Sequence, residues 1–223
     1  MSTPGVTGTA TGTATGTATG TASGPTGGTV LVLDTETTGL PQRSLSSGYR
    51  GLAPPTDVRS YDGARLLELA YIVLQFPALT EVRRECFLVQ PSSGGFVVHN
   101  HDVHGITQAM AEADGRPLAE VLDHFARDLV DCVCIVAHNV DFDTRILRSE
   151  YYRAQRLDEA RVIELCPTWC TMLKGTRPGQ KWPKLTELHA QLMPTSSVVT
   201  QSHRALPDAE LCLECYQCQQ ASR

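Results

Sequence analysis

The stretch TVLVLDTETTGL, residues 29–40, runs from a continuous apolar segment straight into two carboxylates. Apolar character without alternation is typical of a central strand that is buried on both faces. Asp34 and Glu36 fall at or just past the C-terminal end of this strand, which is where open α/β sheets bind their ligands. At a spacing of two, both carboxylates leave a strand on the same side.

Two carboxylates so close together repel one another unless a cation lies between them. Mg²⁺ and Mn²⁺ prefer hard oxygen ligands of this kind. The stretch therefore predicts a metal site. An acidic turn after a strand, without a metal, is the alternative that this stretch alone leaves open.

The composition limits the classes of protein to consider. A chain of 223 residues with 41% hydrophobic content suits one domain with a real core, and a tail besides. A formal net charge of −5 excludes a global basic surface, so any contact with nucleic acid must come from a local patch or from metal ions. No apolar run reaches the roughly 18 residues that span a bilayer. Eight scattered cysteines without a signal-peptide pattern indicate reduced thiols of an intracellular protein, in a compartment that stays open.

Residues 1–28 differ from the rest of the chain in composition. The unit Thr-Gly-Thr-Ala repeats from Thr7 to Ala22, and no charged residue precedes Asp34. Such a stretch buries too little apolar surface to offset its ordering entropy. We therefore predict a disordered tail over residues 1–28 and one domain over residues 29–223.

The remaining pattern predicts an alternation of strands and helices. Strands are expected over residues 66–76 and 82–90 as an antiparallel hairpin, over 133–137 parallel to the first strand, and over 162–166. Helices are expected over residues 118–129, 142–156, 183–192 and 207–219, and a long loop over 41–62. This order predicts a mixed sheet with helices packed on it.

Two further acidic elements lie at the starts of predicted helices. His138-Asn-Val-Asp-Phe-Asp143 ends a strand and opens a helix, which places Asp143 in the first turn and favours Asp141 as the N-cap. His203 precedes a helix that begins near Pro207, with Asp208 in its first turn. Each element alone is weak evidence for function.

Together, Asp34-x-Glu36, His138-Asn-x-x-Phe-Asp143 and His203-x-Ala-x-x-Asp208 resemble the three exonuclease motifs of the DEDDh branch of the DnaQ-like 3′–5′ exonucleases. The segments LELA (67–70), HGIT (104–107) and KLTEL (184–188) are similar to further segments of that family, so the resemblance covers about residues 29–219. It implies an α/β, ribonuclease H-like fold, with a mixed five-stranded sheet flanked by helices.

The resemblance also implies a mechanism. Asp34, Glu36, Asp143 and Asp208 would bind two divalent ions, Mg²⁺ or Mn²⁺, with Asp34 between them; two such ions suit phosphodiester hydrolysis. His203 would be the general base, since histidine exchanges a proton near neutral pH. The expected products are nucleoside 5′-monophosphates from the 3′ end of single-stranded DNA or RNA.

Substrate-binding residues follow by analogy. The turn formed by Thr37, Thr38, Gly39 and Leu40 would seat the terminal nucleoside, with Leu40 against its base, and His138 and Asn139 are further candidates. Lys181 and Lys184 lie between Glu164 and Glu187, a segment without Asp or Glu that also holds Lys174, Arg177, Trp169 and Trp182. This segment predicts a strand-binding patch, with a solvated basic loop as the alternative.

Several alternatives stay open at this point. A nucleic-acid-binding module that has lost catalysis is disfavoured by the presence of all five catalytic positions, and a phosphatase with an Asp nucleophile does not explain the His203–Asp208 element. DNA versus RNA, and a polymerase or homodimer partner, are undecided. Zinc ligands are also conceivable among His99, His101 and His104, and among Cys166, Cys170, Cys212, Cys215 and Cys218, although free cysteines commonly pack as small hydrophobes.

Overall fold

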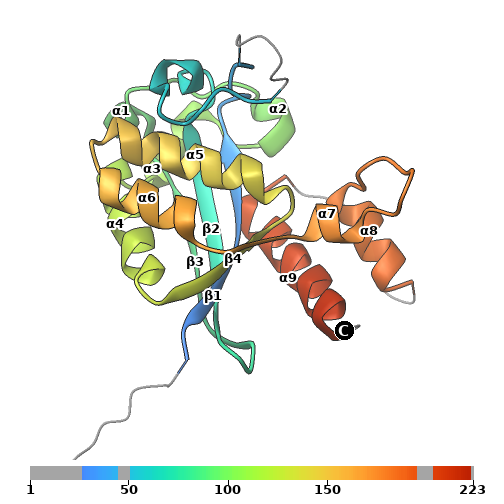
Figure 1. The fold of residues 1–223 in the computed structure, drawn as a ribbon. Helices are drawn as coiled ribbons and strands as arrows, with labels where there is room; N and C mark the ends of the chain where they lie inside the picture. The colour runs from blue at the N-terminus through green and yellow to red at the C-terminus, as the bar shows by residue number, and fades with distance from the viewer. Residues whose placement is uncertain (1–26, 45–50, 195–202, 222–223) are drawn as a thin grey trace, which may run out of the picture.

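A five-stranded sheet forms the centre of the computed structural model, which describes residues 27–44, 51–194 and 203–221 (Figure 1). The strand order is β3-β2-β1-β4-β5. Strands β1 (Thr29–Thr37), β4 (Cys132–Ala137) and β5 (Thr168–Cys170) run parallel, and β2 (Leu66–Gln75) and β3 (Thr80–Leu88) form an antiparallel hairpin beside β1. This mixed sheet with flanking helices confirms the predicted ribonuclease H-like α/β fold.

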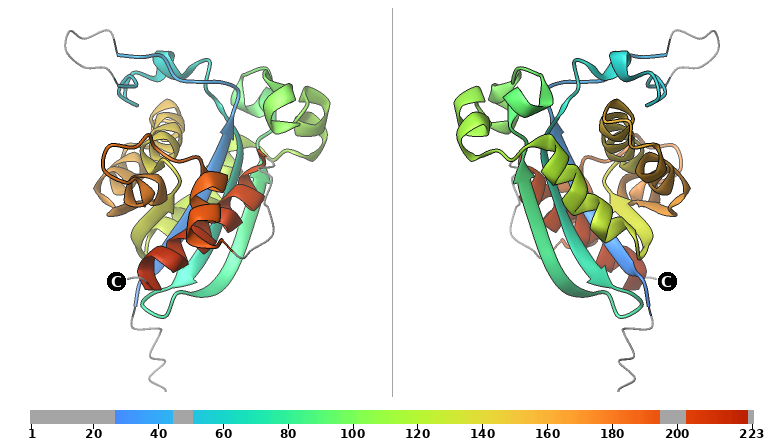
Figure 2. Two further views of the ribbon diagram at one scale, coloured as in Figure 1. Left: turned by 90° about the vertical axis from the view of Figure 1, so that its right-hand side faces the viewer. Right: turned by 90° about the vertical axis from the view of Figure 1, so that its left-hand side faces the viewer.

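Helices cover both faces of the sheet. Figure 2 shows α4 (Leu118–Leu129) across one face and α9 (Ala205–Ala221), with α8 (Leu185–Leu192), across the other. The remaining helical segments of the described residues are α1 (Pro91–Gly94), α2 (His101–His104), α3 (Gln108–Asp114), α5 (Val140–Arg153), α6 (Leu157–Leu165), α7 (Thr171–Gly175) and the 3₁₀ turn η1 (Val58–Tyr61). None of the helices in this part of the chain is long and apolar enough to cross a membrane.

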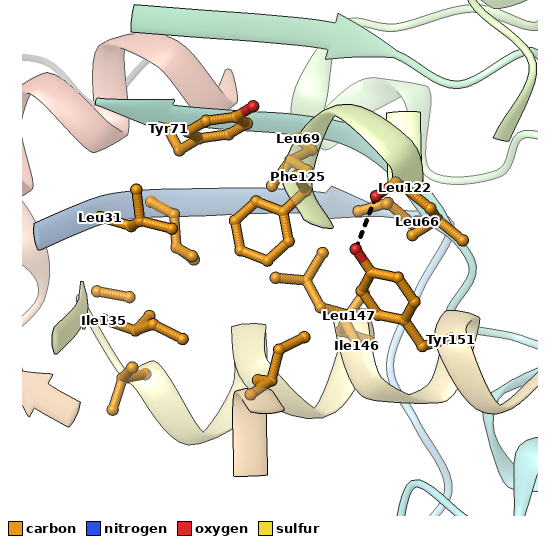
Figure 3. Close-up of a cluster of buried hydrophobic side chains, with 14 of the residues drawn as sticks. Leu31, Leu66, Leu69, Tyr71, Leu122, Phe125, Ile135, Ile146, Leu147 and Tyr151 are labelled. Carbon is orange, nitrogen blue, oxygen red and sulfur yellow. Dashed lines mark hydrogen bonds between the residues drawn. The ribbon is translucent and has the colours of Figure 1, made fainter. Parts of the chain in front are cut away.

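Strand β1 is buried on both sides, as its unbroken apolar run predicts. Leu31 and Leu33 belong to the cluster packed against α4 and α5, while Val30 and Val32 belong to the cluster packed against α9. Figure 3 shows the first cluster, in which the Tyr151 hydroxyl donates to the Leu122 carbonyl at 2.8 Å. Since side chains alternate along a strand, the even-numbered carboxylates of β1 point to the α9 side.

The predicted strand over residues 162–166 is wrong. Residues 162–165 are the last turn of α6, Cys166 is its C-cap, and the fifth strand is β5, which begins at Thr168. Ala160 and Ile163, three residues apart, are buried in the core, whereas Val162 and Leu165 are exposed. This is the spacing of a helix. The helix ends there because a proline disfavours helical backbone at the residue before it, and Pro167 follows Cys166.

The predicted N-cap of α5 is also wrong. Asn139 occupies that position, with a left-handed backbone (φ 75°) that Asn tolerates. Asp141 lies inside the first turn instead and pairs with Arg145 at 2.8 Å. The helix therefore starts at Val140, two residues before the predicted start.

The other predicted elements are confirmed, with ends that shift by at most three residues, the largest shift being the end of α5 at Arg153 instead of residue 156. The predicted loop over 41–62 contains η1 and a short bridge between Arg43 and Leu52, and the short helices α1, α2, α3 and α7 were not predicted. The predicted tail lies outside the described residues except for Gly27 and Gly28, whose carbonyls accept hydrogen bonds from the Gln75 side chain at 2.9 and 3.2 Å. The boundary after residue 28 stays a prediction.

A buried ion pair connects α5 to the start of β2. The Arg65 guanidinium donates to both carboxylate oxygens of Glu150, at 2.7 and 2.9 Å, and the Leu66 amide donates to the same carboxylate at 3.0 Å. The two side chains are 5% and 1% exposed. Removing one partner from such a pair leaves an unpaired buried charge.

We therefore expect Glu150→Leu to lower the free energy of unfolding by about 3–5 kcal/mol. The double variant Glu150→Leu with Arg65→Met removes both charges. Its free energy of unfolding should fall clearly less than that of Glu150→Leu, because neither charge of the pair is left buried without its partner. Urea unfolding followed by circular dichroism measures both values. A double variant that is no more stable than Glu150→Leu would contradict this account of the pair.

Candidate active site

Three carboxylates meet on the α9 side of β1. Asp34 and Glu36 come from the last residues of the strand, and Asp208 comes from the first turn of α9. Each of the three offers an oxygen that lies within 4.8 Å of the others. Within the described ranges, no other set of three or more His, Cys, Asp or Glu side chains is close enough to share a metal ion, so the alternative zinc sites find no support there.

Asp143 approaches the same strand end from α5. Its Oδ1 accepts hydrogen bonds from the Thr35 amide at 3.1 Å and from the Thr35 hydroxyl at 2.8 Å. Thr35 lies between Asp34 and Glu36 in sequence and faces the opposite side of the sheet, so it fixes Asp143 beside them. The structure thus brings all four predicted carboxylates to the end of β1.

Burial raises the pKa values of three of these carboxyls, and neighbouring negative charges add to the effect for Asp34 and Glu36. Burial, and then the charge of Asp143, hold the pKa of Asp34 well above its usual range. Burial and the charge of Asp208 raise the pKa of Glu36 to about 8, and burial raises the pKa of Asp143 to about 7 against the hydrogen bonds from Thr35. A divalent cation relieves such repulsion, and a donor set of carboxylate oxygens alone fits a hard ion.

Glu68 supports the site from β2, and the sequence analysis missed this role. It lies opposite Glu36 in the register of the two strands, and its side chain is 1% exposed. It accepts hydrogen bonds from Arg204 Nε at 3.0 Å and Nη2 at 2.5 Å, and from the Ala205 amide at 2.9 Å. Glu68 therefore holds the first turn of α9, which carries Asp208, and keeps a guanidinium beside Glu36. A single Glu within the apolar run LLELAYIVL was the available hint.

A cleft of about 500 Å³ opens beside the carboxylates. Its lining residues are Asp34, His138, Asn139, Met172, Trp182, Pro183, Lys184, Leu185 and His203. The predicted base, His203, is exposed and has a left-handed backbone (φ 48°) one residue before Arg204. The structure thus places His203, Asp34 and three predicted substrate-binding residues around one cleft.

His138 shapes the wall of this cleft. Its ring nitrogens lie 3.0 Å from the Thr171 hydroxyl and 3.0 Å from the Pro183 carbonyl oxygen. Because a carbonyl only accepts, Nε2 donates to Pro183 and Nδ1 accepts from Thr171. Burial lowers the pKa of His138, in keeping with this neutral ring. Both nitrogens are engaged within the protein, so His138 positions the Pro183 segment instead of offering a hydrogen bond to a substrate.

The turn after β1 has a fixed backbone. The Thr38 hydroxyl accepts from the Arg65 amide at 3.0 Å, the Thr38 carbonyl accepts from Asn100 at 2.9 Å, and the Thr37 hydroxyl donates to the Gly39 carbonyl at 2.7 Å. A Cβ at Gly39 would lie 2.6 Å from the Gly63 carbonyl oxygen, so the close approach requires glycine. Leu40 projects from this fixed turn with 79% of its surface exposed.

The two predicted lysines have different surroundings. Lys184 lines the cleft. Lys181 lies outside it, in an adjoining hollow, where it pairs with Glu187 at 3.4 Å. The structure thus separates the two residues that the sequence analysis grouped.

Comparison with known proteins gives a family match over most of the chain. The model of the exonuclease family RNase_T matches residues 31–216. A stretch of 133 residues, 60% of this chain and 8% of the relative, is 35% identical to the PolC-type DNA polymerase III of Thermotoga maritima.

Solved structures with the same fold include E. coli Exonuclease I in complex with a dT13 oligonucleotide. It aligns with a TM-score of 0.60 and 19% identity over 85% of this chain and 40% of that chain. A zinc ion-bound form of the E. coli Exonuclease I–single-stranded DNA complex aligns with a TM-score of 0.59 and 18% identity, over 88% and 41% of the two chains. The chain therefore spans less than half of each of these proteins, and the likeness at such identities is one of fold.

Proposed function

The chain belongs to the exonuclease family, in the DnaQ-like 3′–5′ exonuclease superfamily, and from this membership we propose that it shortens single-stranded nucleic acid from the 3′ end. The products would be nucleoside 5′-monophosphates. The observation that carries the proposal is the convergence of Asp34, Glu36, Asp143 and Asp208 at one strand end, beside a cleft that His203 also lines.

Two divalent cations, Mg²⁺ or Mn²⁺, would bind the carboxylates. Asp34, Glu36 and Asp208 would hold one ion, and Asp34 with Asp143 the other. The short distances among the first three side chains support this assignment, because their oxygens lie close enough to share one ion. Burial and the neighbouring charges raise the pKa of Asp34, and a bound cation would favour its ionised form. When bound, such ions neutralise the scissile phosphate and stabilise the leaving oxygen.

His203 would act as the general base. A water oxygen attacks the phosphorus, its proton passes to the imidazole, and the bond from phosphorus to the 3′-oxygen of the preceding nucleotide breaks. The exposed position of His203 leaves its ring free to turn toward such a water, and it lines the same cleft as Asp34.

The turn after β1 would receive the terminal nucleoside. Leu40 is an exposed apolar side chain on a backbone that Arg65 and Asn100 hold in place. An apolar side chain fixed at the edge of a polar site is suited to pack against the terminal base, whichever base it is.

The experiment that tests this proposal uses matched DNA and RNA oligonucleotides with a 5′ label, in Mg²⁺ or Mn²⁺. A 3′–5′ exonuclease gives a ladder of shortened strands that retain the label, whereas digestion from the 5′ end releases the label at once. Excess EDTA should stop the reaction. Tight binding without any shortening would identify an inactive binding module. The nucleic acid that is shortened at the higher rate, DNA or RNA, would be the preferred substrate.

A further inference from the structure

The segment between Glu164 and Glu187 contains four cationic residues and no carboxylate. Its cations are Lys174, Arg177, Lys181 and Lys184. Most of them lie around the connection between α7 and α8, which stands away from α4 and α6 (Figure 1). The whole chain has a net charge of −5, but this segment is locally positive. A polyanion bound there is not repelled by any acidic side chain of the segment itself.

Trp182 occupies the point where this segment meets the active site. It lines the cleft together with Asp34 and His203, and 64% of its surface is exposed. Trp169, in contrast, is engaged within the protein: its indole N–H donates to Gln219 at 2.9 Å, and its ring packs edge-on against Tyr216. A large exposed aromatic ring beside a nucleic-acid-processing site offers a face on which a base can stack.

The position of Trp182 is set by the residue that follows it. The Pro183 carbonyl accepts the hydrogen bond from His138 at the end of β4, so this point of the connection is fixed to the sheet. Trp182 and Lys184 flank the fixed point and both line the cleft. A solvated loop without function would not need this anchor next to the carboxylates.

A second hollow, of about 270 Å³, lies next to the cleft. Pro183 lines both spaces, and Arg177 and Lys181 line the second one. The Lys181–Glu187 pair at its edge is exposed, and exposed ion pairs contribute little stability. Lys181 can therefore exchange Glu187 for a phosphate at small cost.

We propose that the single strand leaves the active site along these two adjoining spaces. An upstream base stacks on Trp182, and backbone phosphates contact Lys184 and then Arg177 and Lys181. This inference rests on the proposed exonuclease function and adds the path of the substrate. Because stacking and phosphate contacts do not read base edges, the path accepts any sequence, and it favours strands long enough to reach the second hollow.

Binding of a fluorescent 12-nucleotide single strand in EDTA tests the path separately from catalysis. Trp182→Leu should raise Kd by about 5- to 150-fold, the range that base stacking supplies, and Trp182→Phe should recover most of the affinity. Arg177→Ala with Lys181→Ala should flatten the slope of log Kd against log salt by about 1.4, because two phosphate contacts are lost. Arg127→Ala with Arg161→Ala removes the same charge from α4 and α6 and should leave the slope nearly unchanged.

Kinetics in Mg²⁺ complete the test. Arg177→Ala with Lys181→Ala should raise KM for the 12-nucleotide strand, keep kcat within a few-fold and leave cleavage of a dinucleotide unchanged. The path would be rejected by an unaltered Kd in Trp182→Leu, or by a salt slope that flattens as much in Arg127→Ala with Arg161→Ala as in Arg177→Ala with Lys181→Ala. Either result would reject it even if the protein is an active exonuclease. If the Kd values change as expected but the protein cleaves no substrate, the path is supported and the proposed activity is rejected.

Discussion

Asp34→Asn should abolish the release of 5′-mononucleotides while the domain stays folded. Asp34 belongs to the group with Glu36 and Asp208, and the charge of Asp143 acts on it more strongly than any other, so both proposed ions depend on it. Charge stabilisation by bound metal is worth several kcal/mol, and each 1.4 kcal/mol is tenfold in rate. We therefore expect a loss of about 10³-fold or more in kcat.

The same substitution should stabilise the metal-free protein. In the absence of ions, Asp34 is repelled by four neighbouring carboxylates, and the amide removes that repulsion at almost constant volume. Thermal unfolding in EDTA should therefore show an unchanged or higher midpoint for Asp34→Asn, and a smaller rise on addition of Mg²⁺ or Mn²⁺. Asp114→Asn, at the exposed end of α3, is the matched control and should behave as the unaltered protein in both assays. Full activity of Asp34→Asn, or of the unaltered chain in excess chelator, would refute the metal-dependent mechanism.

Local pattern was enough to predict the centre of this fold. The unbroken run Val30–Leu33 requires two apolar neighbours, and the structure supplies α9 on one side and α4 with α5 on the other. The spacing of Asp34 and Glu36 then fixes their common side. The pattern failed at residues 162–166, where a short apolar run suits a strand and a helix equally. The helix is distinguished from a strand by the joint burial of Ala160 and Ile163. Which side chains are buried depends on the packing of the whole core, so the local sequence does not reveal it.

The supporting residues of the site could not be predicted, because their partners are distant in sequence. Thr35 binds a residue 108 positions away, and Glu68 binds Arg204 at a separation of 136 positions. Short motifs record which side chains carry charge but not which backbone groups hold them. The connection that carries Lys181 and Trp182 has no periodicity either, so its sequence did not reveal that Trp182 lines the cleft while Lys181 lies outside it.

The role of His203 is tested by His203→Asn, which should lower kcat by about 10²–10⁴-fold, the usual range for loss of a general base. Asparagine is the informative choice because it tolerates the left-handed backbone at this position, where φ is 48°. Alanine would add backbone strain next to Arg204 and confuse loss of the imidazole with displacement of α9. The rise in thermal midpoint on addition of Mg²⁺ should be nearly unchanged, since the carboxylates are intact. His101→Asn, on an exposed side chain of α2, serves as the control.

A chemical rescue separates a catalytic His203 from a structural one. His203→Gly also accepts the left-handed backbone and leaves a vacant position at an exposed edge of the cleft. Free imidazole can enter that position and accept the proton, so it should restore part of the lost kcat in His203→Gly and leave Asp34→Asn inactive. A structural histidine gives a different result, because added imidazole cannot rebuild a displaced helix start. An unaltered kcat in His203→Asn, or a lost kcat that imidazole never restores in His203→Gly, would assign the proton transfer to another group.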